Sequence, residues 1–310
     1  MDGRLDVLAM GEALVEFNQA QRDDPRVYLQ GFGGDTSNMA IAAARLGARA
    51  GYLTHVGDDL FGQWLIDLWR AEGVDTRAVA VDAAHPTGIY FVTHGEHGHA
   101  FSYRRAGSAA SHMARTTLPV DAIRATRFLH LSAISQAISA GAADACAAAI
   151  AIARAAGVQV MYDTNLRLKL WPLSRAREVI RATLRDVDWA LPSLDDAREI
   201  YAIDDADAII DAVLADGARN VVLKMGAQGC TLATGGQRRH LGGHAVAAID
   251  ATGAGDCFDG AFVARLCRGD DPADAAAYAN AAAALSTQGF GAVAPLPRPA
   301  AVAALVGIAR

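Results

Sequence analysis

The residues best suited to chemistry lie close together near the C-terminal end of the chain, in residues 250–260 (DATGAGDCFDG). Two glycines separated by one alanine allow successive backbone N–H groups to turn toward one point, and the apolar run 261–266 predicts a helix just after them. The N–H groups of a first helical turn, together with the helix dipole, stabilise a phosphate whose negative charge grows during transfer. The pattern predicts an anion-binding cradle at a helix N-terminus, with Gly253, Ala254 and Gly255 as its donors.

Asp256 lies beside this cradle and is the candidate general base. A carboxylate in that place accepts the proton of a substrate hydroxyl as the hydroxyl oxygen attacks phosphorus. We expect the positive field of the cradle to keep Asp256 ionised before any substrate binds. The alternative is a glycine-rich turn capped by an aspartate. The chain contains no Gly-x-x-x-x-Gly-Lys-Ser/Thr sequence, so the cradle is not a P-loop.

A second glycine-rich stretch, residues 31–38 (GFGGDTSN), precedes a helix that we expect over residues 39–46. Paired glycines such as Gly33 and Gly34 let a ligand approach the backbone closely. Asp35 and Asn38 offer side-chain hydrogen bonds to hydroxyl groups. By itself, the stretch is weak evidence for a ligand site, and a helix-entry turn is the favoured explanation.

The elements that must position these residues alternate between strand and helix, which predicts an α/β fold with a mostly parallel sheet and helices on both faces. A buried strand over residues 158–162 delivers the sequence DTNLR at its carboxyl end, where open α/β sheets bind ligands. Arg167 is the candidate there for contacting an anion, and an exposed loop arginine is the alternative. Further strands are expected at residues 5–10, 51–56, 128–131, 189–191 and 221–224, and helices at 61–72, 140–156 and 274–285.

Two hairpins are expected outside this alternation, one pairing residues 14–18 with 27–30 and one pairing 88–93 with 99–104. If the second closes symmetrically around residues 95–98, Tyr90 faces Tyr103 across the hairpin. Arg105 then shares the face of Tyr103, while Arg104 points the other way. A polar, aromatic and cationic face of this kind needs a partner, either a bound sugar acid or the equivalent sheet of another protomer.

The turn of the second hairpin is surrounded by His94, Glu96, His97 and His99, which invites a metal-site interpretation. A glycine-flanked exposed turn holds its side chains too loosely for a fixed zinc geometry. We therefore favour a solvated loop.

Both glycine-rich stretches resemble the signatures of the ribokinase-like (PfkB) carbohydrate kinases. The C-terminal signature of that family is D-T-x-G-A-G-D-x-F, and Ala251 stands here where the family usually has threonine. Its N-terminal signature runs from a glycine pair through an asparagine to a later glycine, and this chain has Gly33, Gly34, Asn38 and Gly57 at those places.

The resemblance covers nearly the whole chain. It implies one ribokinase-like α/β domain over residues 1–310, with a small β lid formed by two inserted segments, about residues 12–32 and 87–106. In the family, the C-terminal signature carries the base and the anion hole, which supports the roles given above to Asp256 and the glycines beside it.

A third stretch, residues 163–171 (DTNLRLKLW), resembles the D-x-N-x-R-x-x-L-W pattern of the 2-keto-3-deoxygluconate kinases, among which the G-G-D-T form of residues 33–36 is also common. The resemblance implies ATP-dependent phosphorylation of the primary 6-hydroxyl of 2-keto-3-deoxygluconate, giving the 6-phosphate and ADP. By that resemblance Arg105 and Arg167 contact the substrate carboxylate, and Tyr90 and Tyr103 contact its hydroxyls. The remaining residues implied on the sugar side are Gly33, Gly34, Asn38 and Asp256.

ATP and Mg²⁺ are the cofactors that the resemblance implies. After the strand expected at 221–224 comes a Gly-x-x-Gly sequence, for which a nucleotide loop and an ordinary hairpin are both open. Relatives often carry N-x-x-E where this chain has Ser193 and Asp196. Asp196 and Asp250 are candidates for contacting the metal through water. The alternative for Ser193 and Asp196 is a helix N-cap followed by an acidic residue in the first turn. The nucleotide contacts implied are Asn165, Ser193, Lys224, Gly226, Gly229, Gly253, Gly255 and Asn280.

Composition limits the partners and the cellular location that we expect for this protein. The chain has 310 residues, a formal net charge of -6 and no long run of Lys and Arg, which argues against nucleic acid as a partner. Its four cysteines form no C-x-x-C pair, and residues 1–15 lack the pattern of a signal peptide. We expect a cytoplasmic, membrane-free enzyme that binds a sugar acid and ATP and forms a homo-oligomer through its lid sheets.

Two alternatives stay open at this stage. One is a fructokinase or ribokinase that acts on a neutral sugar. The other is a sugar-acid sensor on a kinase scaffold without turnover, against which the intact base and anion hole argue. The sequence does not choose between the gluconate and galactonate epimers.

Overall fold

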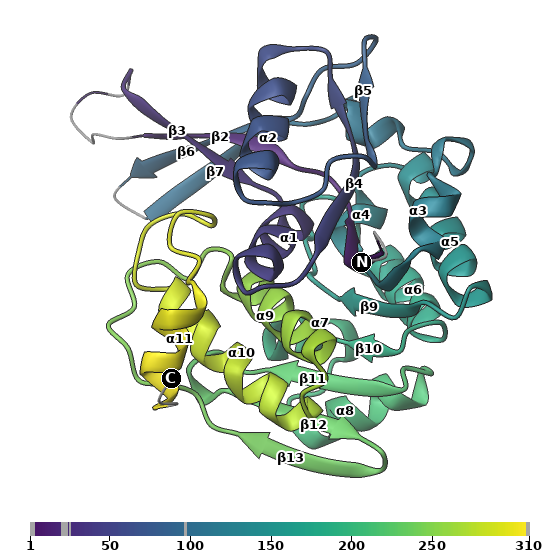
Figure 1. The fold of residues 1–310 in the computed structure, drawn as a ribbon, viewed down its shortest axis with the longest axis vertical. Helices are drawn as coiled ribbons and strands as arrows, with labels where there is room; N and C mark the ends of the chain where they lie inside the picture. The colour runs from purple at the N-terminus through teal and green to yellow at the C-terminus, as the bar shows by residue number, and fades with distance from the viewer. Residues whose placement is uncertain (1–3, 20–23, 25, 96–97, 308–310) are drawn as a thin grey trace.

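The fold is organised around a nine-stranded sheet, seen in a computed structural model that describes residues 4–19, 24, 26–95 and 98–307 (Figure 1). The strand order is β13-β12-β11-β10-β9-β8-β1-β4-β5. Neighbouring strands pair in parallel from β5 through β11, and β12 and β13 pair antiparallel at one edge. The strands are β1 (Leu5–Met10), β4 (Ala50–Gly57), β5 (Val79–Asp82), β8 (Thr126–Ser132), β9 (Gln159–Asp163), β10 (Trp189–Ala190), β11 (Asn220–Lys224), β12 (Cys230–Thr234) and β13 (Gln237–Leu241).

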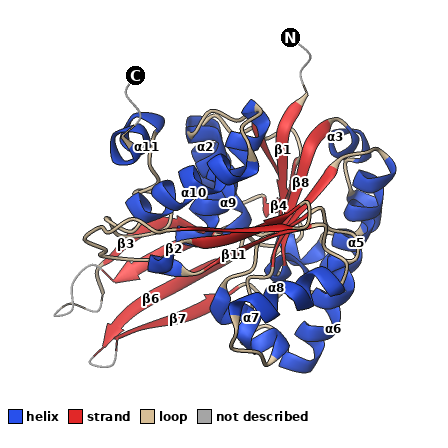
Figure 2. Cartoon of the chain, turned by 90° about the horizontal axis from the view of Figure 1, so that it is seen from below, coloured by secondary structure: helices blue, strands red, loops and turns tan. Residues whose placement is uncertain are grey.

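Helices cover both faces of this sheet (Figure 2), as the alternation of strands and helices predicts. Strand β1 is buried on both sides, since Val7 and Ala9 belong to one hydrophobic cluster while Leu8 and Met10 belong to the other. The first cluster packs against α1 (Asp35–Arg45), α2 (Leu60–Ala71), α9 (Ala254–Arg268), α10 (Pro272–Ser286) and α11 (Pro299–Val306). The second packs against α3 (Val120–Arg124), α4 (Ala133–Ala137), α5 (Ala140–Ala155), α6 (Leu173–Leu184), α7 (Leu194–Tyr201) and α8 (Ala206–Ala215).

A separate four-stranded sheet, which we call the small sheet, extends from one side of the molecule in the order β3-β2-β6-β7 (Figure 1). It unites the two predicted hairpins, because β2 pairs antiparallel with β3 and parallel with β6. Tyr90 lies directly opposite Tyr103, so the predicted register of the second hairpin is confirmed. Its strands are β2 (Leu14–Gln19), β3 (Tyr28–Gly33), β6 (Ile89–Gly95) and β7 (Gly98–Arg104).

Two of the four residues in the metal-site interpretation of the second hairpin turn, Glu96 and His97, lie outside the described residues. Over the residues that are described, no three or more His, Cys, Asp or Glu side chains are grouped so as to hold a metal ion. Within the same residues, no helix combines the length and the apolar character that crossing a membrane requires.

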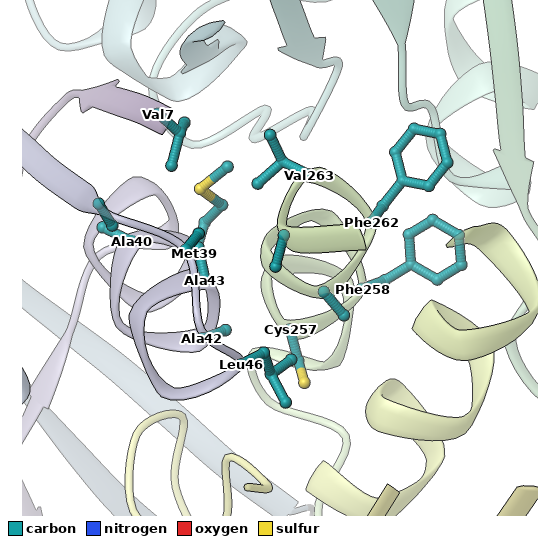
Figure 3. Packing of buried hydrophobic residues seen from close by; sticks show 14 of the residues in the cluster. Val7, Met39, Ala40, Ala42, Ala43, Leu46, Cys257, Phe258, Phe262 and Val263 are labelled. Carbon is teal, nitrogen blue, oxygen red and sulfur yellow. The ribbon is translucent and has the colours of Figure 1, made fainter. Parts of the chain in front are cut away.

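Helices α1 and α9 bring the two glycine-rich stretches together, since they pack directly against each other beneath the site (Figure 3). Small and sulfur-containing side chains fill their interface, among them Met39 and Ala42 of α1 and Cys257 of α9. The helices approach most closely at Gly260, where an added Cβ would lie 2.5 Å from the carbonyl oxygen of Met39 and 2.7 Å from the Cβ of Ala42.

We expect Gly260→Ala to lower the free energy of unfolding by about 1–3 kcal/mol, because α1 and α9 must separate to admit the methyl group. Thermal unfolding measures the effect. Gly242→Ala is the matched control, since a Cβ there would meet nothing within 4 Å. An unchanged melting temperature for Gly260→Ala would contradict the close packing of the two helices.

Candidate active site

The candidate site lies at the carboxyl edge of the parallel strands, next to β1. The chain crosses from β1 to β4 on one side and β8 lies on the other, so β1 marks the point where open α/β sheets bind ligands. Strands β8, β9 and β11 end at Ser132, Asp163 and Lys224, and Glu12 follows the end of β1. The N-terminal turns of α1 and α9 meet this same edge and add Asn38 and Asp256.

The predicted anion cradle is the start of α9. Gly253 is the N-cap residue, with a φ of 75° that favours glycine, and no side chain caps the helix there. The N–H of Ala254 donates to the carbonyl oxygen of Ala251 at 3.1 Å. The turn that forms the cradle therefore uses the amide of Ala254, whose role as a phosphate donor stays a prediction. The amides of Gly253 and Gly255 have no acceptor within the described parts of the chain, and their role as donors stays a prediction as well.

Asp250 holds the loop that precedes this helix. Its carboxylate accepts hydrogen bonds from the backbone N–H and the hydroxyl of Thr252, at 2.9 and 2.6 Å. It also accepts one from the N–H of Gly291 at 2.9 Å, which links the loop to the C-terminal tail. Asp250 therefore shapes the cradle, and its water-mediated contact with a metal stays a prediction.

Asp256 lies in the first turn of α9 and accepts a hydrogen bond of 2.8 Å from the side-chain amide of Asn38. This contact joins the two glycine-rich signatures across 218 residues of sequence. The side-chain oxygen of Asn38 is buried and has no partner among the described residues. A substrate hydroxyl placed there would find a carboxylate as its proton acceptor and an amide oxygen beside it.

The ionisation state of Asp256 differs from our expectation. Burial and the neighbouring carboxylate of Asp35 raise the pKa of Asp256 to about 7, although Asn38 and Lys224 act in the opposite direction. A carboxylate with a pKa near neutrality is well matched to accepting and releasing a proton.

Asp35 organises the next part of the site. The hydroxyl of Ser132 and the side-chain amide of Asn165 both donate to one oxygen of Asp35, the second at 3.0 Å. The N–H of Thr36 donates to the other oxygen at 2.8 Å. Asn165 is thus buried against the sugar side of the site, and its predicted contact with the nucleotide stays a prediction.

Glycines 33 and 34 form the entry to α1 and touch the small sheet. An added Cβ on Gly33 would lie 2.4 Å from the hydroxyl of Tyr90, and one on Gly34 would lie 2.5 Å from the carbonyl oxygen of Glu12. Gly34 also has a φ of 116°, a conformation that L side chains rarely adopt. Gly33 therefore lets the backbone approach Tyr90, which we predict to bind sugar, and Gly34 lets it approach the backbone of Glu12.

The small sheet presents Tyr90, Tyr103 and Arg105 together, as the hairpin register predicts. The rings of Tyr90 and Tyr103 stack with centroids 5.6 Å apart, and the guanidinium of Arg105 lies 5.7 Å from the centroid of Tyr103. Sequence reasoning did not anticipate two buried carboxyl groups that hold these side chains. Tyr90 donates its hydroxyl proton to Glu16 at 2.5 Å, and Arg105 forms an ion pair with Glu12, its Nε lying 2.7 Å from a carboxylate oxygen.

Arg167 is exposed and follows the end of β9, where it donates to the carbonyl oxygen of Leu166 at 2.8 Å. Its positive charge reaches the site, since it lowers the pKa of both Asp35 and Asp196 against the larger effect of burial, which raises both. Its charge therefore acts on the part of the site that contains Asp35.

The residues predicted for the nucleotide are distributed along the same sheet edge. Ser193 is the N-cap of α7 and accepts from the N–H of Asp196 at 3.1 Å, so the helix-cap alternative describes this pair. Burial raises the pKa of Asp196, which disfavours the charged form that a metal prefers.

The Gly-x-x-Gly sequence forms a hairpin turn, since β11 and β12 pair antiparallel around Gly226 and Gly229. Asn280 donates to the carbonyl oxygens of residues 241 and 242 at 3.1 and 3.3 Å.

Lys224 has a different environment from the one we expected. Its ammonium group lies 3.0 Å from a carboxylate oxygen of Asp163 and 3.0 Å from one of Asp259, and only 10% of the side chain is exposed. Its predicted contact with ATP stays a prediction. Sequence reasoning missed both partners, although Asp259 comes three residues after Asp256 on the same helix, and such spacing places two side chains on one face.

Comparisons with known proteins agree with this geometry. The model of the family described as pfkB family carbohydrate kinase matches residues 4–299. The 2-dehydro-3-deoxygluconokinase of Thermoproteus tenax is 33% identical over 96% of this chain and 94% of its own length. A probable fructokinase-5 of Arabidopsis thaliana is 31% identical over 95% of both chains. The crystal structure of a putative ribokinase II from E. coli with ATP and Mg²⁺ superimposes with a TM-score of 0.90 and 27% identity, over 98% of this chain and 99% of that one.

Proposed function

The chain belongs to the pfkB family of carbohydrate kinases, and we propose that it phosphorylates 2-keto-3-deoxy-D-gluconate at its 6-hydroxyl with ATP, giving 2-keto-3-deoxy-6-phosphogluconate and ADP. The observation that carries the choice of substrate is the pair Arg105 and Arg167, which adds positive charge to the sugar side of a site otherwise lined by carboxyl groups. A sugar acid needs such charge at the end remote from the reacting hydroxyl, whereas a neutral sugar does not.

In the proposed reaction, Asp256 accepts the proton of the 6-hydroxyl while the oxygen attacks the terminal phosphorus of ATP. Asn38 holds Asp256 in place through its side-chain amide. The amides of Gly253 and Gly255 stabilise the charge on the transferring group. The uncapped glycine turn fits a phosphate, so ATP would place its phosphates there and supply the phosphoryl group, and Mg²⁺ would neutralise their charge. Tyr90 and Tyr103 hold the sugar hydroxyls, and the two arginines hold the carboxylate.

The pH dependence of activity should follow Asp256. Its pKa is raised to about 7, and a general base works only in its deprotonated form, so activity is present above about pH 7 and is lost as the pH falls through that value. With saturating ATP and Mg²⁺, we expect kcat/KM for the sugar to fall about tenfold per pH unit below the pKa and to be level above it. A kcat/KM that stays level down to about pH 5.5 would contradict a base with a raised pKa.

A panel of sugars tests the choice of substrate. We expect ADP release to be fastest with 2-keto-3-deoxygluconate or its galactonate epimer, and at least about a hundredfold lower kcat/KM with fructose and ribose. A neutral sugar as the best substrate would overturn the proposal and leave the family assignment unaffected.

A neutral-sugar kinase is the second candidate, and one observation favours it. Glu12 pairs with Arg105 inside the protein, so part of the positive charge of Arg105 is already neutralised before substrate binds. Several curated relatives of similar identity are fructokinases, among them fructokinase-1 of Oryza sativa subsp. japonica at 31%. The sugar panel decides between the two candidates. Assembly through the small sheet stays a prediction.

A further inference from the structure

A buried charged cluster lies beneath the anion cradle, and the proposed reaction does not yet use it. Its centre is the ammonium group of Lys224, held by Asp163 and Asp259. All three side chains are at least nine-tenths buried. A buried amine and its carboxylates cost desolvation energy, so a hydrophobic replacement of similar volume is often no less stable. A role beyond stability is therefore a reasonable inference for these three residues.

The cluster joins the three elements that carry the site. Asp163 ends β9 and precedes the loop to Arg167, while Lys224 ends β11. Asp259 lies one turn beyond Asp256 in α9. The ammonium also lies close under the cradle, since a Cβ added to Gly255 would be 3.5 Å from the Nζ atom. Lys224 is thus positioned to fix the sugar-binding loop relative to the base and the cradle.

The ionisation of the cluster places the positive charge of Lys224 next to the cradle, paired with the negative charge of Asp163. Burial would lower the pKa of Lys224, but Asp163 and Asp259 outweigh it and the pKa is raised, so the amine is charged. Burial would raise the pKa of Asp163, but Lys224 outweighs it and the pKa is lowered. Burial raises the pKa of Asp259 and the nearby charge of Asp163 raises it further, while Lys224 acts in the opposite direction. These directions favour Lys224 and Asp163 as the charged pair.

The charged groups that face Asp256 come from every element around it. Asp35 of α1 and Asp163 of β9 disfavour its negative form, while Lys224 of β11 favours it. His130 of β8 contributes no charge near neutral pH, because burial lowers its pKa to about 4. Lys224 is thus the cation in this set whose charge lowers the pKa of Asp256.

We propose that Lys224 is a positioning residue for phosphoryl transfer, whose ammonium, clamped between Asp163 and Asp259, locks the end of β9 against the first turns of α9 and places a fixed positive charge beneath the base and the anion cradle. The inference rests on the proposed role of Asp256. It differs from a direct contact with ATP, because Lys224 acts through Asp256 and the cradle.

The test is Lys224→Met, which keeps the length of the side chain and removes its charge. We expect kcat to fall about tenfold or more and the acid limb of the kcat/KM profile to move up by about one pH unit, because the base loses a stabilising cation. The KM for ATP should stay within about threefold of the wild-type value. A KM for ATP more than about tenfold higher, with kcat and the acid limb unchanged, would overturn the proposal in favour of a nucleotide contact.

Two further variants separate charge from packing. In Lys224→Met combined with Asp163→Asn, both members of the ion pair lose their charge, so the acid limb should return to within about 0.3 pH units of the wild type. This double variant also keeps the test available if Lys224→Met alone does not fold. Asp259→Asn keeps a polar group against the ammonium and leaves Asp163 as its charged partner, so it should move the acid limb by less than Lys224→Met does. If the acid limb of the kcat/KM profile lies at the same pH in all folded variants and in the wild type, the proposal is overturned.

Failure of this inference and failure of the proposed function give different results. If Asp256→Asn retains turnover, the base itself is wrongly assigned. If Asp256→Asn is inactive and Lys224→Met behaves like the wild type, only the role of Lys224 fails.

Discussion

Replacing Asp256 by asparagine is expected to lower kcat by at least about a hundredfold while the KM for the sugar stays within about threefold. Asparagine keeps the size of the side chain and its hydrogen-bonding partner in Asn38. It cannot accept a proton from the attacking hydroxyl. Steady-state kinetics with a coupled ADP assay measures both constants, and an unchanged kcat would remove Asp256 from the mechanism.

The same substitution should stabilise the protein at the pH values where Asp256 is ionised in the wild type. The folded pKa of Asp256, about 7, lies above that of an unfolded aspartate, so the stability that its protonated form contributes is lost as the pH rises through 7. Asparagine has no such loss. We expect the difference in melting temperature between variant and wild type to be larger at about pH 8 than at about pH 5. The control is Asp204→Asn, because that side chain is fully exposed.

Replacing Arg167 by alanine should raise the KM for the sugar acid by about tenfold to a hundredfold, since a charge-assisted hydrogen bond to a carboxylate is worth about 1.5–3 kcal/mol. The KM for ATP and the activity with a neutral sugar should change little. Such a difference between substrates would not follow from a general loss of folding.

Arg104→Ala is the matched control for this experiment. Arg104 is exposed and points to the opposite face of β7 from Tyr103, so its loss should leave the KM for the sugar acid unchanged. Equal losses with acid and neutral sugars in Arg167→Ala would contradict a carboxylate contact and favour the neutral-sugar candidate.

The hairpin register and the start of α9 were predictable from the sequence because residues close together in the chain determine them. The alternation of residues 88–104 predicts the register that places Tyr90 opposite Tyr103, and a slip of one residue would have turned every side chain to the other face. The strand at residues 5–10 was predicted with its observed bounds. The glycine pattern at residues 253–255 predicts the start of α9, although the apolar run alone placed the helix later.

The parts that sequence reasoning missed depend on groups far apart in the chain. The raised pKa of Asp256 comes from burial and from Asp35, which is 221 residues earlier (256 − 35). Lys224 could be placed at the end of a strand, but its two carboxylate partners come from β9 and α9. Neither interaction leaves a periodic signal, because tertiary packing alone creates it.

Several elements were also missed for a local reason. Strands β12 and β13 lie at the edge of the sheet, and β13 consists mainly of exposed polar residues, so it lacks the apolar run of a buried strand. Helix α6 has four charged residues among its twelve, and its buried stripe is limited to three residues. The sequences of β13 and α6 resemble solvated loops more than core elements.

The most direct test of the account is to identify the product. Wild-type enzyme is incubated with 2-keto-3-deoxygluconate, ATP and Mg²⁺, and phosphorus NMR with proton coupling locates the new phosphate. We expect one phosphomonoester, coupled to the protons of the terminal CH₂ group, formed in step with ADP and at least about a hundredfold more slowly with Asp256→Asn. Unchanged 2-keto-3-deoxygluconate, under conditions in which the same enzyme phosphorylates fructose or ribose, would contradict the account.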